Sequence, residues 1–279
     1  MPTLKYPIGL QSFSEIRKGG YVYVDKTAYI HRLVSTGKYY FLTRPRRFGK
    51  SLFLSTLKSY FEGDRELFDG LFISGRVDEW ESSPVFYFDF VNFDTSCIEG
   101  LQSAVEAHLG TWEEQYGANA SEVGYAQRFY GLLKRAVAKT GSRAVVLVDE
   151  YDKPLFSTFD NPELNEQYCH ILKAIYGTLK AADEYIRFAM LSGVTRFSRL
   201  SIFSDLNNLE DISLDTAYSG ICGITEGEIE QYLQDGIDEF ASKNGLDSTM
   251  AMQMLKDNYD GYHFTRRGDD IYNPFSLFR

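Results

Sequence analysis

Short apolar runs alternate with segments of helical periodicity along most of the chain. Residues 39–43 (YYFLT), 84–90 (PVFYFDF), 144–148 (AVVLV) and 186–191 (IRFAML) have the length and the β-branched or aromatic content of buried strands. Residues 51–61 repeat their apolar side chains at helical spacing, and helical patterns fill the interval between the second and third strands. This alternation predicts right-handed β-α-β crossovers. We therefore expect an α/β fold whose mostly parallel sheet is flanked by helices on both faces.

The strand pattern then stops, and helical signals replace it. Thr225 and Glu228 have the spacing of a capping box, which predicts a helix that runs to about Lys243. The pair Asn244-Gly245 breaks this pattern, and a second helix is predicted over residues 247–259. The end of the chain is therefore expected to form a small helical subdomain.

The length of 279 residues fits one α/β domain with an appendage. We expect a core domain over residues 1–215, which includes an N-terminal segment, and a helical lid subdomain over residues 216–279. The final residues, NPFSLFR, read as the approach to a further domain. The lid is accordingly expected to be truncated before a C-terminal effector domain.

The composition favours an ordered globular protein and excludes several other classes of protein. Hydrophobic residues make up 44% and aromatic residues 15% of the chain, which is enough apolar material for an ordered core. Cys97, Cys169 and Cys222 form no CxxC pair, so neither a disulfide framework nor a zinc site is predicted, and a reducing cytoplasm is expected. No signal peptide and no run of about 20 apolar residues is present, so no membrane partner is predicted. The net charge of −10 limits any contact with nucleic acid to a local or indirect one.

A candidate phosphate-binding loop, RPRRFGKS, lies between the strand at 39–43 and the helix at 51–61. It matches the Walker A pattern GxxxxGK[ST] except at the first glycine, which is Arg44. Backbone N–H groups of such a loop surround phosphate oxygens, Lys50 can reach the β and γ phosphates, and the Ser51 hydroxyl can bind magnesium. The nucleotide is expected to contact Arg44, Pro45, Arg46, Arg47, Phe48, Gly49, Lys50, Ser51 and Leu52.

A second motif supports the first. The apolar strand at 144–148 runs into Asp149 and Glu150, the Walker B arrangement, in which Asp149 holds magnesium through water and Glu150 polarises the attacking water. Each motif has an ordinary alternative, a basic surface loop that contains GKS or a strand that ends in a solvated acidic turn. Both motifs, however, follow predicted strands in the right order, at the strand ends where open sheets bind ligands. Together they predict a nucleotide site.

The strand at 84–90 and the glutamate beside Asp149 indicate a particular P-loop subclass. Its sheet has an additional strand between the P-loop strand and the Walker B strand, and it uses a carboxylate base. The additional strand would be 186–191, which would bring Ser192 near the γ-phosphate as a polar sensor and Arg196 within reach of the developing charge. A strand-ending turn at Ser192 and a surface arginine at Arg196 are the structural alternatives.

Several longer strings resemble the bacterial AAA-ATPase-like family, and the resemblance covers nearly the whole chain. They are RPRRFGKS, GYVYVDKT (20–27), LSGVTRFSRLSIFSDLNNLEDISL (191–214), DGYHF (260–264) and YNPFSLF (272–278). The position of the first Walker A glycine is commonly not glycine in this family. Members usually continue into a restriction-endonuclease-like nuclease domain, so the resemblance implies such a domain as a C-terminal partner.

The resemblance also implies ATP as the nucleotide and assigns site residues. It carries Lys50 and Ser51 to phosphate and magnesium, Asp149 to magnesium, and Glu150 to catalysis. Near the loop, Tyr23 or Tyr29 is a candidate for stacking on adenine, with aromatic core packing as the alternative.

Three functions remain open from the sequence. The first is magnesium-dependent ATP hydrolysis that moves the lid and so couples nucleotide state to the effector, with a homo-oligomer as a further partner to expect. The second is a nucleotide-sensing module that does not hydrolyse ATP, which Arg44 and Pro45 favour because they alter the loop. The third is a nucleic-acid-binding module built from basic side chains: Arg44, Arg46, Arg47, Arg196 and Arg199.

Overall fold

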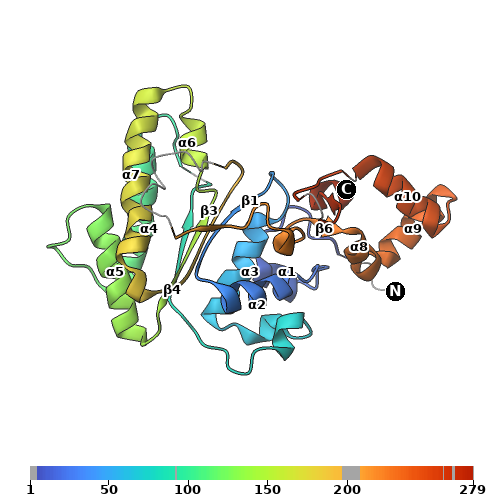
Figure 1. Cartoon of the computed structure of the whole chain (residues 1–279), viewed down its shortest axis with the longest axis horizontal. Coiled ribbons are helices and arrows are strands. Elements are labelled where there is room, and N and C mark those ends of the chain that lie inside the picture. Colours follow the sequence, from blue (N-terminus) through green and yellow to red (C-terminus); the bar gives the residue numbers. More distant parts are fainter. Residues whose placement is uncertain (1–4, 92, 197–207, 260, 266–267, 279) are drawn as a thin grey trace.

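The structure, a computed structural model, describes residues 5–91, 93–196, 208–259, 261–265 and 268–278. Its core is a five-stranded sheet with the strand order β2-β3-β4-β1-β5, and all of its pairings are parallel (Figure 1). The strands are β1 (Tyr39–Thr43), β2 (Val85–Asp89), β3 (Ala144–Asp149), β4 (Ile186–Gly193) and β5 (Glu210–Asp211). The expected α/β fold and its four longer strands are confirmed. The sequence did not predict β5, because this strand consists of two acidic residues and has no apolar run.

The position of β4 decides how the site is assembled. β4 lies between β1 and β3, as predicted for the additional strand. Its last residues pair with the end of β1, where Leu42 is opposite Ser192 and Thr43 is opposite Gly193. In parallel strands the carboxyl ends meet at one edge of the sheet. The loop after β1 and the acidic pair after β3 therefore lie at the same edge, on either side of β4.

Helices cover both faces of the sheet. The first face packs on α4 (Ile98–Tyr116), α5 (Tyr125–Thr140) and α7 (Pro162–Ala181). The second face packs on α1 (Phe13–Lys18), α2 (Thr27–Thr36) and α3 (Lys50–Glu62). Successive side chains of a strand point to opposite faces, so alternate residues of the fully buried β3 enter the two cores. The apolar runs in the sequence are explained by this burial on both sides.

The other described elements before β6 are short connections. They are η1 (Arg65–Phe68), η2 (Phe72–Gly75), α6 (Lys153–Ser157), η3 (Asp183–Tyr185) and η5 (Thr216–Tyr218). In the described part of the chain, no helix combines the length and apolarity needed to cross a membrane.

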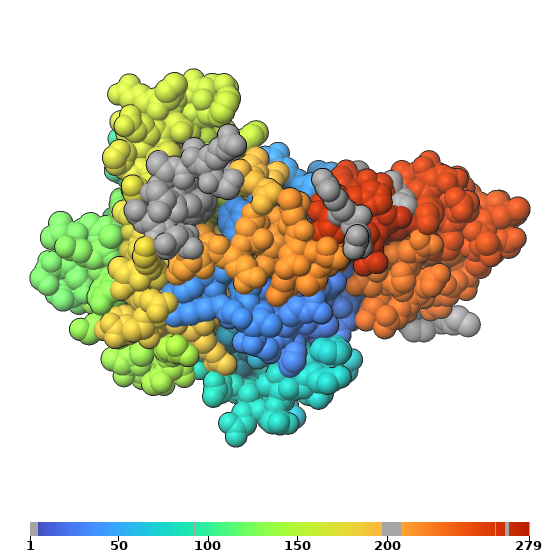
Figure 2. Space-filling model, in the orientation of Figure 1, coloured from blue at the N-terminus to red at the C-terminus, as the bar shows by residue number. Residues whose placement is uncertain are grey.

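The C-terminal region, residues 216–278, projects from one side of the sheet domain and contains a small apolar cluster that begins at Ile224, whereas its residues Tyr218, Ile221, Cys222 and Ile271 pack in the second core under the sheet (Figures 1 and 2). It contains a two-stranded antiparallel ribbon and several helices. These elements are β6 (Ile224–Thr225), α8 (Glu226–Tyr232), α9 (Gln234–Asn244), α10 (Ser248–Tyr259), β7 (Ile271–Tyr272) and α11 (Pro274–Leu277). The boundary at 215/216 stays a prediction.

The predicted capping box is present: the Thr225 hydroxyl accepts from the Glu228 N–H at 3.2 Å, and the Glu228 carboxylate accepts from the Thr225 N–H at 2.8 Å. The prediction of one helix to Lys243 was wrong, because α8 and α9 are separate helices joined at Leu233. The buried positions continue at a spacing of four residues through the break, as Ile229, Leu233, Ile237 and Ala241. An apolar pattern that does not change across the junction gives no signal for it.

Candidate functional site

The loop between β1 and α3 has the backbone of an anion site. Arg47 and Gly49 both adopt left-handed conformations, with φ of 68° and 90°. Left-handed residues occur in the backbone concavities that bind anions, and a left-handed non-glycine residue such as Arg47 costs about 1–2 kcal/mol. Gly49 is the N-cap of α3 and has no side chain with which to cap the first turn. No side chain therefore caps the positive end of this 13-residue helix, the end at which an anion is favoured.

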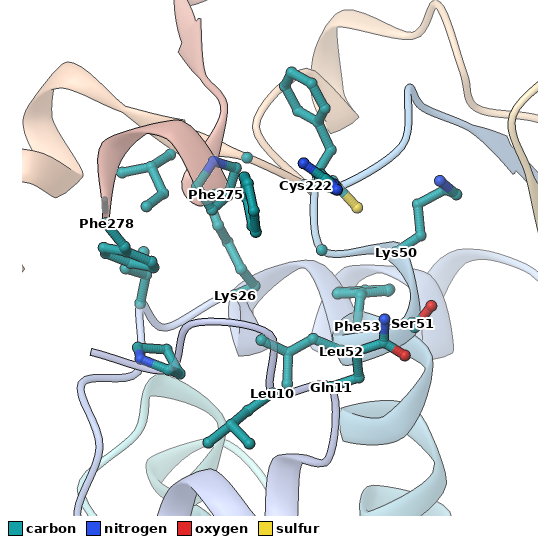
Figure 3. A pocket seen from close by; sticks show the side chains of 18 of the residues that line it. Leu10, Gln11, Lys26, Lys50, Ser51, Leu52, Phe53, Cys222, Phe275 and Phe278 are labelled. Carbon is teal, nitrogen blue, oxygen red and sulfur yellow. The ribbon is translucent and has the colours of Figure 1, made fainter. Parts of the chain in front are cut away.

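Lys50, the first residue of α3, lies across this loop. Its ammonium donates to the Pro45 carbonyl oxygen at 3.1 Å, and the residue is only 6% exposed. Ser51 follows it at the start of the helix (Figure 3). An ammonium has three donors, so the hydrogen bond to Pro45 still leaves Lys50 able to bind phosphate oxygens.

The carboxylate of Asp149, at the end of β3, is held by three donors. The Ser192 hydroxyl donates to Oδ1 at 2.7 Å, the Glu150 N–H donates to Oδ1 at 3.0 Å, and the Tyr87 hydroxyl donates to Oδ2 at 3.3 Å. Asp149 itself is 2% exposed. Burial, and next the charge of Asp149, raise the pKa of Tyr87, which keeps the phenol protonated as a donor. Ser192, predicted to be a sensor at the γ-phosphate, orients Asp149 in this structure.

Sequence reasoning missed Tyr87. The signal was present in the order of the strands, because a tyrosine inside PVFYFDF sits on the strand next to the Walker B strand. Which residue of that run reaches Asp149 depends on the register, in which Asp89 is opposite Asp149.

Glu150 has an unusual backbone and an unusual environment. Its φ is 50°, a left-handed conformation that a non-glycine residue adopts at a cost, and its side chain is half-buried. Burial raises its pKa, and the neighbouring Asp149 charge raises it further, while the Lys153 ammonium, 3.9 Å from Oε2, and Lys50 act in the opposite direction. A carboxylate with raised proton affinity is suited to accept a proton from water.

Arg196, predicted to reach the developing charge, interacts with a carboxylate outside the cavity. It forms an ion pair with Asp211 of β5, with Nε and Oδ2 3.1 Å apart, and its side chain is exposed. It does not line the cavity described next. Arg199, the other arginine considered for this region, lies outside the described residues.

A cavity of about 340 Å³ opens beside the loop, between three parts of the chain (Figure 3). One wall is the start of α3 with the loop before it, the second is the N-terminal segment, and the third comes from the C-terminal region. Lining residues from the second and third walls are mostly apolar: Ile8, Leu10, Val22, Val24, Phe275 and Phe278. Its size is within the range of small-molecule sites.

Positive charge is concentrated in this cavity although the whole chain is acidic. Lys26, Arg46, Arg47 and Lys50 line it, whereas Glu150 is the one carboxylate among the described lining residues. The Lys26 ammonium is neutralised by Glu228, whose two oxygens are each 2.6 Å away. The other three cations belong to the loop end of the cavity wall. A polyanion with an apolar end would match both halves of the cavity.

Comparisons with known proteins identify the family of the chain. The sequence profile of the AAA-ATPase-like family, described as predicted AAA-ATPase, matches residues 7–203. The chain belongs to the AAA-ATPase-like family. It is also 40% identical over 278 residues to an uncharacterized protein encoded in the 5′ region of vnfD in Azotobacter chroococcum mcd 1. The match covers 99% of this chain and 52% of that protein, so the chain spans about half the length of its relative. No solved structure matches.

Two of the predicted loop contacts have other partners in this AAA-ATPase-like chain. Arg44, at the place of the first Walker A glycine, is 1% exposed and does not line the cavity. Its guanidinium donates to the carbonyl oxygens of Ser213 at 2.7 Å and Tyr218 at 3.0 Å, and it lies 4.2 Å from the ring centroid of Phe264. Pro45 contributes its carbonyl to Lys50 and does not line the cavity either. Arg44 therefore joins the loop to the chain that leads into the C-terminal region.

A substitution that restores the general motif, Arg44→Gly, is expected to destabilise this AAA-ATPase-like protein. It leaves buried carbonyl groups without their donor, which costs about 2–4 kcal/mol. Chemical denaturation should show this loss, whereas Arg46→Gly, an exposed arginine of the same loop, should change the free energy of unfolding by less than about 1 kcal/mol. Equal stability of the two variants would contradict the bracing role of Arg44.

Asp152 is a further residue that the motifs did not reveal. It is buried, and its Oδ2 accepts from the N–H groups of Val194 at 2.9 Å and Thr195 at 2.7 Å. Gly193 permits this approach, since a Cβ there would lie 2.6 Å from Oδ1 of Asp152. Asp152 thus fixes the segment after β4 against the segment after β3.

The tyrosines considered for base stacking differ. Tyr23 is a buried part of the cavity wall, where its ring packs edge-on against Phe13 with centroids 5.0 Å apart. Tyr29 packs near Tyr218, with centroids 6.5 Å apart, and does not line the cavity.

Proposed function

We propose that this chain binds ATP with magnesium at the carboxyl edge of its sheet and hydrolyses it. The observation that carries the proposal is the arrangement across β4. The cationic loop at the end of β1 and the Asp149–Glu150 pair at the end of β3 share one edge. A phosphate chain between them would meet donors on one side and a base on the other.

The residues present suit the triphosphate. The loop N–H groups and the start of α3 would surround the β and γ phosphates, and Lys50 would exchange its bond to the Pro45 carbonyl for phosphate oxygens. Arg46 and Arg47 add charge at the same end of the cavity. The apolar walls would receive the base and sugar.

The metal's donor set is also suitable. A hydroxyl at Ser51 and a carboxylate at Asp149 are oxygen ligands of the kind magnesium prefers, and two donors already orient the Asp149 carboxylate through its Oδ1. When bound, magnesium neutralises charge on the transferred phosphoryl group. Because Ser192 and Tyr87 fix the Asp149 carboxylate, this carboxylate would not need to change its orientation when it binds magnesium.

Glu150 is the proposed general base. The oxygen of a water molecule forms a bond to the γ-phosphorus as the bond from that phosphorus to the ADP oxygen breaks, and the water proton passes to the Glu150 carboxylate. The raised pKa of Glu150 favours this transfer. This is the catalytic-glutamate type of P-loop site.

Nucleotide state is proposed to reach an effector through the C-terminal region, which the loop contacts directly. The Phe48 carbonyl accepts from the Gly223 N–H at 2.8 Å, and the Phe48 ring packs edge-on against Tyr262 and Phe264. A C-terminal nuclease domain and a homo-oligomer are the partners we propose for the full protein, with nucleic acid reached indirectly. The uncharacterized relative, about twice as long, leaves room for such a domain.

A sensing module without hydrolysis is the second candidate. The observation that favours it is the ion pair of Arg196 with Asp211, because the arginine predicted to stabilise the transition state is engaged by a carboxylate. Arg196 would have to leave Asp211, or another subunit would have to supply an arginine. Direct binding of nucleic acid is less well supported, since Arg44 is buried and Arg196 is paired.

The decisive measurement combines nucleotide titration with phosphate release. ATP at 100 times its Kd is expected to stabilise the folded chain by about 2.7 kcal/mol, and phosphate release is expected to stop when EDTA removes the metal. GTP and adenosine are the matched ligands that report base and phosphate selectivity. Stabilisation without turnover would support the sensing module, and no stabilisation by any nucleotide would contradict both candidates.

A further inference from the structure

The last helix of the described chain places an aromatic ring against the phosphate-binding loop. The guanidinium carbon of Arg47 lies 4.0 Å from the ring centroid of Phe275, the second residue of α11. Both residues line the cavity, and Figure 3 shows the Phe275 ring reaching into it from α11. The contact joins a loop residue to one more than 200 positions further along the chain.

The backbone holds α11 in this place. β7, which immediately precedes the helix, pairs with β6, where Tyr272 is opposite Ile224. The Gly223 N–H, just before β6, donates to the Phe48 carbonyl of the loop at 2.8 Å. Asn273 caps α11 by accepting from the Phe275 N–H at 2.9 Å. The loop therefore contacts β6, β6 pairs with β7, and β7 leads into the helix whose ring returns to the loop.

The contact leaves the hydrogen-bonding edge of the guanidinium available. A guanidinium that stacks by its face keeps its N–H donors, which point outward in the plane of the group. Within the described part of the chain, these donors of Arg47 have no protein acceptor. Arg46 has no such ring beneath it in the same part of the chain, so Phe275 distinguishes the two arginines of the loop.

We propose that Phe275 is a positioning residue of the phosphate site: its ring holds Arg47 over the cavity with the N–H edge toward the phosphates of the nucleotide. This inference rests on the proposed ATP binding. It makes α11 part of the site, so arrival or loss of phosphates biases the position of the C-terminal helix. By reciprocity, a displaced α11 weakens nucleotide binding.

A double-mutant cycle tests the proposal through the affinity for ATP of four proteins: wild type, Phe275→Leu, Arg47→Ala and the double variant. Phe275→Leu is expected to weaken ATP binding about 3- to 10-fold, the range of one cation–π contact. In the Arg47→Ala background the same change should have little further effect. Phe275→Tyr keeps the ring and should keep the affinity within about twofold of wild type.

Phe278→Leu is the matched control. Phe278 lines the same cavity from the end of the same helix, but its ring stacks on Tyr6, with centroids 5.3 Å apart. Its substitution should change ATP affinity equally with and without Arg47. The loss of affinity caused by Phe275→Leu should also be smaller for ADP than for ATP and absent for adenosine. The reason is that the group positioned by the ring is the Arg47 guanidinium, which binds phosphates.

The outcomes separate the two proposals. Two results with a wild type that binds ATP would show that the ring only lines the cavity. The free-energy losses from Phe275→Leu and Arg47→Ala could simply add, or Phe275→Leu could weaken adenosine binding as much as ATP binding. Either result overturns the inference and leaves the proposed function standing. If wild type binds no nucleotide, the proposed function fails and the inference fails with it. Thermal unfolding of each variant identifies any loss caused by misfolding, and Phe275→Tyr then decides the role of the ring.

Discussion

Glu150→Gln is expected to lower the rate of phosphate release by at least about 100-fold while ATP affinity stays within about threefold. The amide keeps the size of the side chain but cannot accept a proton from the attacking water. Binding is spared because the loop and Lys50 hold the phosphates. Single-turnover phosphate release and equilibrium titration, measured on the same preparation, separate the two effects.

The pH profile adds a second readout for Glu150. The pKa of Glu150 is raised in the nucleotide-free protein, so kcat/KM for ATP, which reports the free enzyme, should fall as the pH drops through a value above that of an ordinary glutamic acid. The residual activity of Glu150→Gln should not show this fall at low pH. Asp89→Asn is the matched control, since Asp89 ends the neighbouring strand opposite Asp149 and is exposed. Turnover that survives Glu150→Gln unchanged would remove the assigned base.

Much of the fold could be predicted because buried strands and helix faces consist of apolar residues that are close together in the sequence. β3 is buried on both faces, so AVVLVD reads as an apolar run that ends in a carboxylate. The loop could be identified for a similar reason, because Gly49, Lys50 and Ser51 are consecutive and have tasks fixed by backbone geometry. The place of β4 between β1 and β3 followed from matching these motifs to a known subclass of P-loop sheets.

The roles of individual side chains were less predictable, because they depend on partners far away in the chain. Arg44 donates to carbonyl oxygens about 170 residues later in the chain, and Ser192 donates to the carboxylate of Asp149, 43 residues earlier. Arg196 meets Asp211 on a strand too short to give a signal. Motifs define which backbone approaches the ligand, whereas long-range contacts decide which side chains remain available for it.

These contacts also change how the missing Walker A glycine is interpreted. A glycine at position 44 would free the loop, but Arg44 ties it to the chain before β6, while Phe48 and Arg47 tie it to β6 and α11. The loop is thus attached to the C-terminal region at three of its residues. The proposed coupling of nucleotide state to an effector requires an attachment of this kind.

Lys50→Ala is expected to weaken ATP binding about 10- to 100-fold, which corresponds to the loss of one charge-assisted contact to phosphate. The change removes the ammonium at the start of α3 and leaves the backbone N–H groups of the loop in place. The effect should be smaller for ADP and absent for adenosine. Isothermal titration with the three ligands would report the affinities.

Lys58→Ala is the control for Lys50→Ala, because Lys58 lies on the same helix, its side chain is 45% exposed, and it pairs only loosely with Glu62, 3.8 Å away. It should leave ATP affinity unchanged. The fold should tolerate the loss of Lys50, since its ammonium donates to a single loop carbonyl in the described structure, and the unfolding temperature checks this. An ATP affinity that is the same in Lys50→Ala and wild type would mean that the triphosphate does not lie at the start of α3. The assignments of Ser51, Asp149 and Glu150 would then lose their common basis, because each is defined by its position relative to those phosphates.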